Sequence, residues 1–141
     1  MDKPPYLVSC VSKKAREPMA ARDLYQSQWF VKARRYVENQ GGDWLILSAL
    51  HGVVAPDQII APYDKTLSRM PIAERRSWSA GMLTTLQSGC LQGRRCVVLA
   101  GHAYREFLID PLRRDVTVEI PMEGMAIGRQ LQWLSQHGAR Q

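Results

Sequence analysis

The chain lacks long apolar runs and has few of the residues that build disulfide or zinc sites. Its 141 residues include three cysteines, at positions 10, 90 and 96, and three histidines. No two cysteines form a Cys-x-x-Cys pair and the histidines are scattered, so neither a disulfide framework nor a zinc site is expected. No apolar run approaches the ~20 residues that span a bilayer. The composition therefore argues against membrane-spanning, disulfide-stabilised and zinc-stabilised proteins, and it predicts neither a metal nor a cofactor.

An internal repeat, a low-complexity tract and a secretory signal are also missing. The N-terminal residues 1–5 lack the apolar core of a signal peptide. We therefore expect a cytoplasmic protein with reduced cysteines and no membrane partner. A hydrophobic content of 45% and a charged content of 23% are typical of a globular protein. Because the length is that of one domain, residues 1–141 are predicted to form a single domain.

Positive charge is in excess: 19 Lys and Arg residues face 13 Asp and Glu residues, for a net charge of +6. Several basic residues form doublets, such as Arg113-Arg114, which are typical of solvated helix ends and turns. The cluster of Lys13, Lys14 and Arg16 differs, because it directly follows a predicted strand. A phosphate-bearing partner, either a nucleotide or a nucleic acid, is the class that this charge favours. The oligomeric state is left open.

Short apolar runs predict four strands, near residues 6–9, 45–48, 96–100 and 116–120. Continuous runs are typical of strands buried on both faces, whereas the alternating run at 116–120 indicates a sheet edge. Helical spacing predicts helices near residues 19–25, 28–40, 72–86, 103–112 and 128–137. Strands that alternate with helices predict an α/β domain in three layers, with a mostly parallel central sheet of about four strands and helices on both faces.

A long connection between residues 56 and 71 contains three prolines and predicts an extended path without a regular helix. A connection of this length in a compact domain usually serves function. Tyr63 and Asp64 lie on it. The tyrosine is suited to stacking on a ligand, and the aspartate to acid-base chemistry.

Polar or reactive residues follow each predicted strand. Since parallel strands end at the same edge of a sheet, these residues are expected to gather where open α/β sheets bind their ligands. They are Ser9, Cys10, Ser48, His51, Gly52, Gly101, His102, Tyr104, Glu123 and Gly124. The simpler interpretation of Ser48 and His51 is that they hydrogen-bond to the backbone of a tight loop.

Two of these side chains, Glu123 and His102, have two interpretations each. Glu123 is a candidate general acid or base with a raised pKa, or else a carboxylate that caps a helix. His102 and Tyr104 are suited to orienting or stacking on a ligand. A histidine after a strand is as often a partner of loop backbone groups.

Cys10 stands between a predicted strand and a basic loop, where positive charge would lower the pKa of its thiol. The alternative is a small buried residue, because free cysteine is among the most buried residue types. Lys13 and Lys14 are suited to holding a phosphate as point charges.

Five motifs extend over nearly the whole chain. They are Ser9-Cys10-x-x-Lys13-Lys14, Ile46-Leu47-Ser48-Ala49-x-x-Gly52, Pro62-Tyr63-Asp64-x-Thr66-Leu67, Ala100-Gly101-x-x-Tyr104 and Pro121-x-x-Gly124. Together they resemble a bacterial domain family of unassigned function. That family is distantly similar to YaaA-type proteins, which bind DNA, and to the uracil-DNA-glycosylase-like domain of archaeosine synthases. The resemblance implies a pocket for a nucleobase or nucleotide, but no glycosylase catalytic residue matches position by position.

The predicted function is an enzyme that acts on a nucleobase and cleaves or exchanges an N-glycosidic bond. Such a reaction needs a carboxylate, for which Glu123 and Asp64 are candidates, and a group that protonates the leaving base, for which His102 is the candidate. Tyr63 or Tyr104 would stack on the base. One alternative is a non-catalytic module that binds nucleotides or nucleic acid. A further alternative is a hydrolase that depends on Cys10.

Overall fold

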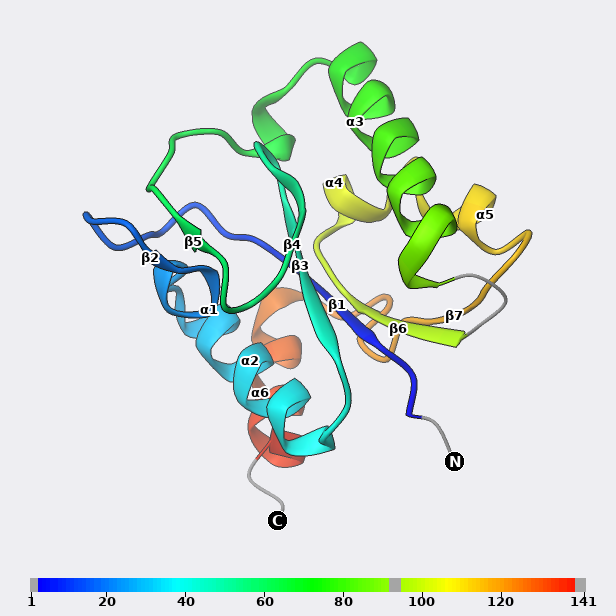
Figure 1. Ribbon diagram of the computed structural model, residues 1–141. Helices are drawn as coiled ribbons and strands as arrows, with labels where there is room; N and C mark the ends of the chain where they lie inside the picture. The colour runs from blue at the N-terminus through cyan, green and yellow to red at the C-terminus, as the bar shows by residue number, and fades with distance from the viewer. Residues whose placement is uncertain (1–2, 92–94, 139–141) are drawn as a thin grey trace.

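Strand β1 (Tyr6–Ser9) lies in the middle of a five-stranded sheet in the computed structural model, which describes residues 3–91 and 95–138 (Figure 1). The other strands are β3 (Trp44–Ser48), β4 (Gly52–Val54), β6 (Arg95–Leu99) and β7 (Thr117–Glu119), in the order β4-β3-β1-β6-β7. Strands β1, β3, β6 and β7 run parallel, and β4 is antiparallel to β3. The predicted fold class, α/β with a mostly parallel sheet, is confirmed.

The two faces of β1 contact two separate apolar layers, because successive side chains of a strand point to opposite faces. Tyr6 and Val8 pack with Phe30 in the first layer, and Leu7 packs with Met82 in the second. Leu7 and Val8 are both fully buried. A central strand buried on both faces accounts for the continuous apolar run that identifies it in the sequence.

Helices cover both faces of the sheet, as Figure 1 shows. One face carries α2 (Gln28–Gln40) and α6 (Ile127–Gly138), which pack on one another. The other face carries α3 (Ile72–Thr85), its π-helical continuation η2 (Leu86–Cys90), and α5 (Ile109–Leu112). Helix α2 begins where predicted, with the Ser27 side chain accepting a hydrogen bond from the Phe30 amide, and it ends at Gly41 in the left-handed conformation.

The four predicted strands are present within one or two residues of their expected bounds, and β7 lies at a sheet edge as expected. Strand β4 was not predicted, because the residues 52–54 read as a loop. Gly52, with a φ of 74°, allows the chain to turn back sharply, so that Ser48 pairs with Gly52 and Leu47 with Val53.

Two helix predictions are wrong. The segment at 19–25 is strand β2 (Met19–Ala20), paired with β5 (Ile59–Ile60), followed by the single turn α1 (Ala21–Leu24). Met19 and Ala20 pair with Ile60 and Ile59, and Tyr25 forms an antiparallel bridge with Lys14, so the helix is limited at both ends.

The second wrong prediction is a continuous helix over 103–112. It is instead two short helices, α4 (His102–Arg105) and α5. Pro111 lies in the first turn of α5 and has no N–H to donate to the carbonyl of Phe107 four residues before it, so the break falls at residues 106–108. The connection at 56–71 contains β5 and the 3₁₀ turn η1 (Leu67–Arg69).

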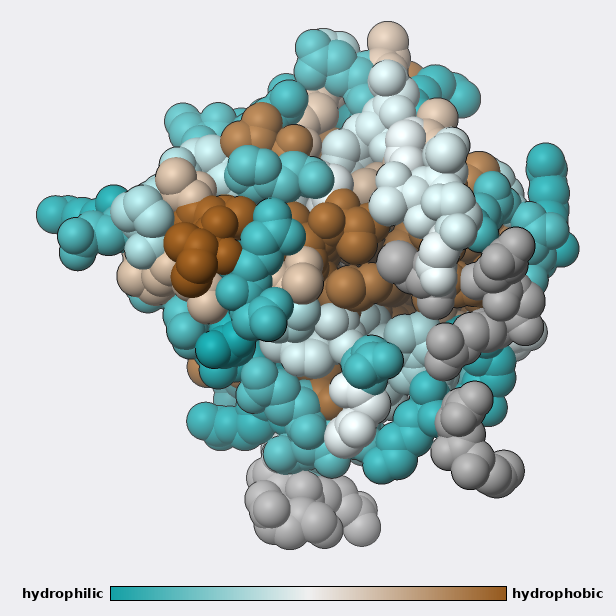
Figure 2. All heavy atoms as spheres, in the orientation of Figure 1, coloured by the Kyte–Doolittle hydropathy of each residue, from teal (hydrophilic) through white to brown (hydrophobic). Residues whose placement is uncertain are grey.

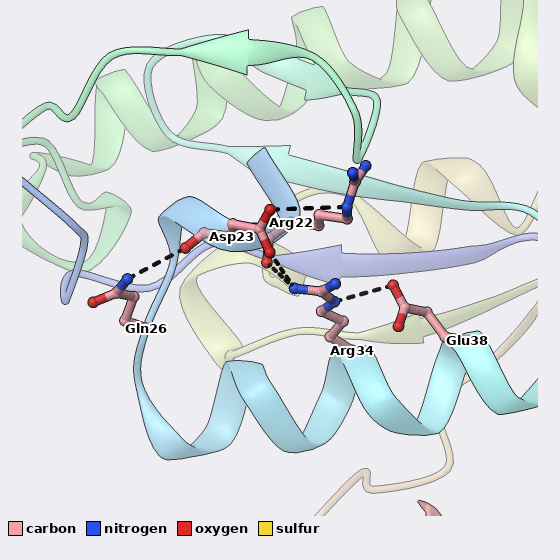
Figure 3. Close-up of polar contacts among 5 residues, drawn as sticks. All are labelled: Arg22, Asp23, Gln26, Arg34 and Glu38. Carbon is pink, nitrogen blue, oxygen red and sulfur yellow. Dashed lines mark hydrogen bonds and ion pairs between the residues drawn. The ribbon is translucent and has the colours of Figure 1, made fainter. Parts of the chain in front are cut away.

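Arg34 fastens α1 to α2, as Figure 3 shows. Its Nη1 donates to Asp23 Oδ1 at 2.7 Å and to the Arg22 carbonyl at 3.0 Å, and its Nε donates to Glu38 at 3.0 Å. The basic loop before α1 is held in turn by hydrogen bonds from the Gln26 amide to the Lys13 carbonyl and from the residue 15 amide to the residue 24 carbonyl. This arrangement fixes where the lysines of the loop lie relative to the sheet.

Candidate functional site

Strands β1, β3, β6 and β7 all end at one edge of the sheet, which we call the carboxyl edge. Cys10 follows β1 there, and its amide donates to the Leu47 carbonyl at 2.9 Å. Ser48 ends β3, and Gly101 precedes α4 beyond the end of β6. The carboxyl edge therefore brings together residues that lie far apart in the sequence.

Ser48 is fully buried and has two roles. Its Oγ accepts hydrogen bonds from the amides of Leu50 at 3.3 Å and His51 at 3.0 Å, which is the loop-bonding role that the sequence allowed. The same oxygen lies 2.8 Å from the hydroxyl of Tyr63. Ser48 thus links the turn after β3 to the long connection at 56–71.

The Tyr63 hydroxyl lies 2.6 Å from the Tyr25 hydroxyl, so that Ser48, Tyr63 and Tyr25 form a continuous hydroxyl chain. Burial raises the pKa of Tyr25 to about 12. Burial, reinforced by the nearby Cys10, also raises the pKa of Tyr63 well above its usual value. Both phenols are therefore neutral at physiological pH and available as hydrogen-bond donors.

Lys14 lies against this hydroxyl chain. Its Nζ is 4.3 Å from the ring centroid of Tyr63 and 5.7 Å from that of Tyr25, within cation–π range. Burial lowers the pKa of Lys14, while the neighbouring Cys10 and Asp64 oppose that change. Lys13 is exposed. Among residues 3–91 and 95–138, its backbone carbonyl accepts a hydrogen bond from the Gln26 amide, whereas its side chain has no hydrogen bond. Two lysines that are adjacent in sequence therefore have different surroundings.

Cys10 pairs with Tyr104, whose hydroxyl lies 3.1 Å from the Cys10 sulfur. Cys10 is 3% exposed, as expected for a buried cysteine. Burial raises the pKa of Tyr104, and Cys10 reinforces the effect. The Tyr104 ring packs edge-on against Trp78, which donates from its indole nitrogen to the Ser48 carbonyl at 3.0 Å. Trp78 therefore connects the Cys10–Tyr104 pair to Ser48 of the hydroxyl chain.

A pocket of about 480 Å³, which we call the edge pocket, opens beside Cys10 and Tyr104. Its walls come from the ends of β1 and β6 and from the first turns of α2 and α6. Trp29 and Leu131 make the apolar wall, and the Trp29 indole donates to Gln130 at 2.9 Å. An apolar pocket with a few fixed polar groups is the usual form of a small-molecule site.

A second, more open groove of about 610 Å³ lies between β4 and α3. His51 and Gly52 line it together with Lys65 and Trp78. Figure 2 shows apolar surface in the hollow beside α3 and over β5, and the hydrophilic loop 11–18 projecting to the left. We place the candidate site at the edge pocket because the buried thiol and phenols adjoin it.

The structure brings some predicted residues to the edge pocket and leaves others outside it. Those that line it are Ser9, Cys10, Gly101 and Tyr104. Ser48 and Tyr63 belong to the hydroxyl chain, and Lys14 lies against it; none of these three residues lines the pocket. Asp64 is exposed near Lys14.

The other two predicted catalytic residues lie on the surface. Glu123 is exposed, and its amide donates to the Ile120 carbonyl in a turn that Gly124 completes with a φ of 81°. The His102 side chain is 78% exposed and lies 3.7 Å from Glu106. Neither side chain lines the edge pocket, as far as the described residues show.

The sequence did not indicate three residues at or near the candidate site: Tyr25, Trp29 and Gln130. Tyr25 read as part of a helix, and the other two read as ordinary residues of amphipathic helices. One signal was available. A helix that follows a parallel strand begins at the carboxyl edge, so the first turns of the predicted helices were candidates for the pocket wall.

In the described ranges, 3–91 and 95–138, no group of three or more His, Cys, Asp or Glu side chains is arranged to hold a metal ion. No helix within these ranges has both the length and the apolar composition required to cross a membrane.

Comparison with known proteins gives one match. Residues 6–136 match the model of a family described as "Family of unknown function (DUF6884)". No curated protein and no solved structure matches the chain significantly.

Proposed function

The chain belongs to the family of unknown function DUF6884, and we propose that it binds a nucleobase, carried by a nucleotide or a nucleic acid, in the edge pocket. The observation that carries this proposal is the pocket itself. It measures about 480 Å³, lies at the carboxyl edge of a parallel sheet, and has aromatic walls.

The wall chemistry suits a planar heterocycle. Trp29 and Tyr104 offer aromatic surface, and stacking of a base on an aromatic side chain contributes about 1–3 kcal/mol. Ser27, Gln28 and Gln130 supply hydrogen-bonding groups for the polar edges of a base. The expected distant likeness of the family to YaaA-type and glycosylase-like domains, together with the net charge of +6, favours the same ligand class.

Cleavage or exchange of an N-glycosidic bond is the second candidate function. The neutral phenol of Tyr63 favours it, because such a group can donate a hydrogen bond to a departing base. Asp64, whose charge acts on Lys14, is the candidate carboxylate for an oxocarbenium-like state. Binding is proposed first, because none of the described residues that line the pocket carries a carboxylate.

The Cys10-dependent hydrolase is supported less well. A thiol nucleophile needs a neighbouring base that takes its proton. Within the described residues, the hydrogen-bond partner of Cys10 is the phenol of Tyr104, whose pKa is raised, rather than a histidine or a carboxylate.

The proposal is tested by titrating the protein with the four common ribonucleosides and the four common deoxyribonucleosides and measuring binding by calorimetry. Leu131→Trp places bulk in the pocket and should weaken binding at least tenfold. Gln132→Trp adds the same bulk at an exposed position of the same helix and should leave affinity unchanged. Binding by none of these ligands, or equal loss in both variants, would contradict the proposal.

The second candidate is tested by measuring release of free base by chromatography. Asp64→Asn should abolish release while it preserves binding, and Glu123→Gln, which changes an exposed carboxylate elsewhere, should preserve both. Absence of base release from every nucleotide and from single-stranded DNA and RNA would leave binding as the function.

A further inference from the structure

The hydroxyl chain of Ser48, Tyr63 and Tyr25 has three hydroxyl protons but only two internal hydrogen bonds, so one proton has no acceptor within the chain. Each hydroxyl carries one proton, and the chain has two hydrogen bonds, Ser48 to Tyr63 at 2.8 Å and Tyr63 to Tyr25 at 2.6 Å. The Ser48 oxygen already accepts from the amides of Leu50 and His51, so both of its lone pairs are occupied. Ser48 therefore donates its own proton to Tyr63.

The remaining bond, between Tyr63 and Tyr25, uses one of two phenolic protons. The other has no acceptor among the residues that the structure describes. Tyr25 is 1% exposed, and a buried hydroxyl without a partner costs about 1–3 kcal/mol. The arrangement in which Tyr25 donates to Tyr63 avoids that loss. It leaves the proton of Tyr63 without an acceptor among the described residues, and therefore able to bond to a ligand oxygen.

The charge beside Tyr63 indicates what that acceptor is. The Lys14 ammonium lies 4.3 Å from the centre of the Tyr63 ring. The free hydroxyl proton of Tyr63 and the nearby ammonium group of Lys14 together favour a negatively charged oxygen over a neutral carbonyl. The negative charge of Asp64 acts on Lys14 and weakens the preference for an anionic ligand, but Lys14 keeps its positive charge.

We infer that Lys14 and the Tyr63 hydroxyl form a subsite for an anionic oxygen, and that the ligand of the edge pocket is therefore a nucleotide that places a phosphate oxygen there. The second half of this inference rests on the proposed nucleobase pocket, and the first half does not. Cys10 connects the two regions, because it lines the pocket and also acts electrostatically on both Lys14 and Tyr63.

Lys13 provides the matched control. Lys13→Ala and Lys14→Ala remove the same charge at adjacent positions, but only Lys14 contacts Tyr63. In titrations with inorganic phosphate and with a nucleoside monophosphate, Lys14→Ala should weaken binding at least tenfold and Lys13→Ala less than threefold. Equal effects of the two variants would overturn the subsite.

Tyr63→Phe tests the hydroxyl. It should weaken the binding of inorganic phosphate and of the monophosphate, although the charge of Lys14 remains, and leave nucleoside binding unchanged. Asp64→Asn should act in the opposite direction and tighten phosphate binding. If Tyr63→Phe fails to fold, the comparison of the two lysine variants decides the matter.

The outcomes separate the two proposals. A wild-type protein that binds nucleoside and monophosphate equally well would overturn the subsite and leave the pocket. Binding of inorganic phosphate, weakened by Lys14→Ala, without any nucleoside binding would support the subsite and overturn the nucleobase pocket.

Discussion

The hydroxyl oxygens of Tyr25 and Tyr63 lie 2.6 Å apart, although 38 residues separate the two tyrosines in the chain. Tyr25 follows the first short helix, and Tyr63 lies on the long connection at 56–71. Their contact closes that connection over the carboxyl edge, where Ser48 completes the chain of hydroxyl groups. The connection therefore contributes the Tyr63 side chain to the hydroxyl chain.

The buried phenol of Tyr25 makes stability depend on pH above neutrality. Its pKa is about 12 in the folded protein and about 10 when exposed. Because the folded pKa is raised, this stability is fully present below pH 10 and is lost as pH rises toward 12. One pKa unit corresponds to about 1.4 kcal/mol, so the loss amounts to as much as about 3 kcal/mol.

Urea unfolding between pH 8 and about pH 11 measures this dependence, and Tyr25→Phe should flatten it. Lys14 has the opposite effect on stability. Because burial lowers its pKa, its charged form destabilises the folded state at neutral pH, and this destabilisation disappears as pH rises toward 10.5. The comparison is therefore made in a Lys14→Gln background. An equally steep fall in the Tyr25→Phe protein would assign the effect to other tyrosines.

The layer between the sheet and α2 depends on Phe30, which is fully buried against Tyr25 and Trp44. Phe30→Ala removes the ring and leaves a cavity, so the free energy of unfolding should fall by about 3–5 kcal/mol. Val31→Ala changes the adjacent position, which is 46% exposed, and should cost less than about 1 kcal/mol. Chemical denaturation of both variants tests the prediction, and similar losses would contradict the assigned helix face.

Arg34 holds α1 through a fork geometry that lysine cannot reproduce. Arg34→Lys would keep the charge but lose the simultaneous contacts to Asp23, the Arg22 carbonyl and Glu38. We expect a loss of about 1 kcal/mol, because the group is partly exposed and screened by solvent. Arg35→Lys, at an exposed position one residue along, should change stability by less than about 0.5 kcal/mol. Equal effects would mean that the contacts of Figure 3 contribute little.

The strands could be predicted because burial on both faces imposes continuous apolar runs, as in Tyr6–Ser9 and Trp44–Ser48. The short elements could not. Met19–Ala20 and Ile59–Ile60 are strands of two residues, which carry no periodic signal and exist because they pair with one another. Strand β4 follows the tight turn that Ser48 stabilises, and its three residues are too few to give a periodic signal.

The site could be predicted in part for the same reason. Cys10 and Tyr104 follow strands that run in parallel, so the shared edge brings them together. The local sequence does not show, however, whether a side chain that follows a strand is buried or exposed. Glu123 and His102 also follow strands, yet their side chains point into solvent. Trp29 and Gln130 meet across 101 residues of sequence, and only the packing of α2 on α6 reveals that they share a wall.

The basic loop should make binding of single-stranded nucleic acid depend on salt. Lys13 and Lys14 lie in the loop that follows β1 at the carboxyl edge. Arg113 and Arg114 are exposed before β7, at the opposite end of the strands. Replacing either pair by alanine removes the same charge. Lysines that contact phosphate release counterions, so the first double variant should weaken binding to all sequences alike and reduce the slope of log K against log salt by about 2.

The arginine pair is the control, because a diffuse attraction depends on net charge, whereas a contact depends on position. Fluorescence anisotropy over a salt series on both double variants separates the two cases. Equal losses would mean that the excess charge acts without a defined contact. Because Lys14 lies on the hydroxyl chain and Lys13 does not, the single variant Lys14→Ala should account for most of the affinity lost with a short oligonucleotide. Lys13→Ala should gain importance only as the strand lengthens and reaches the exposed part of the loop, since each further phosphate contact adds its own release of counterions.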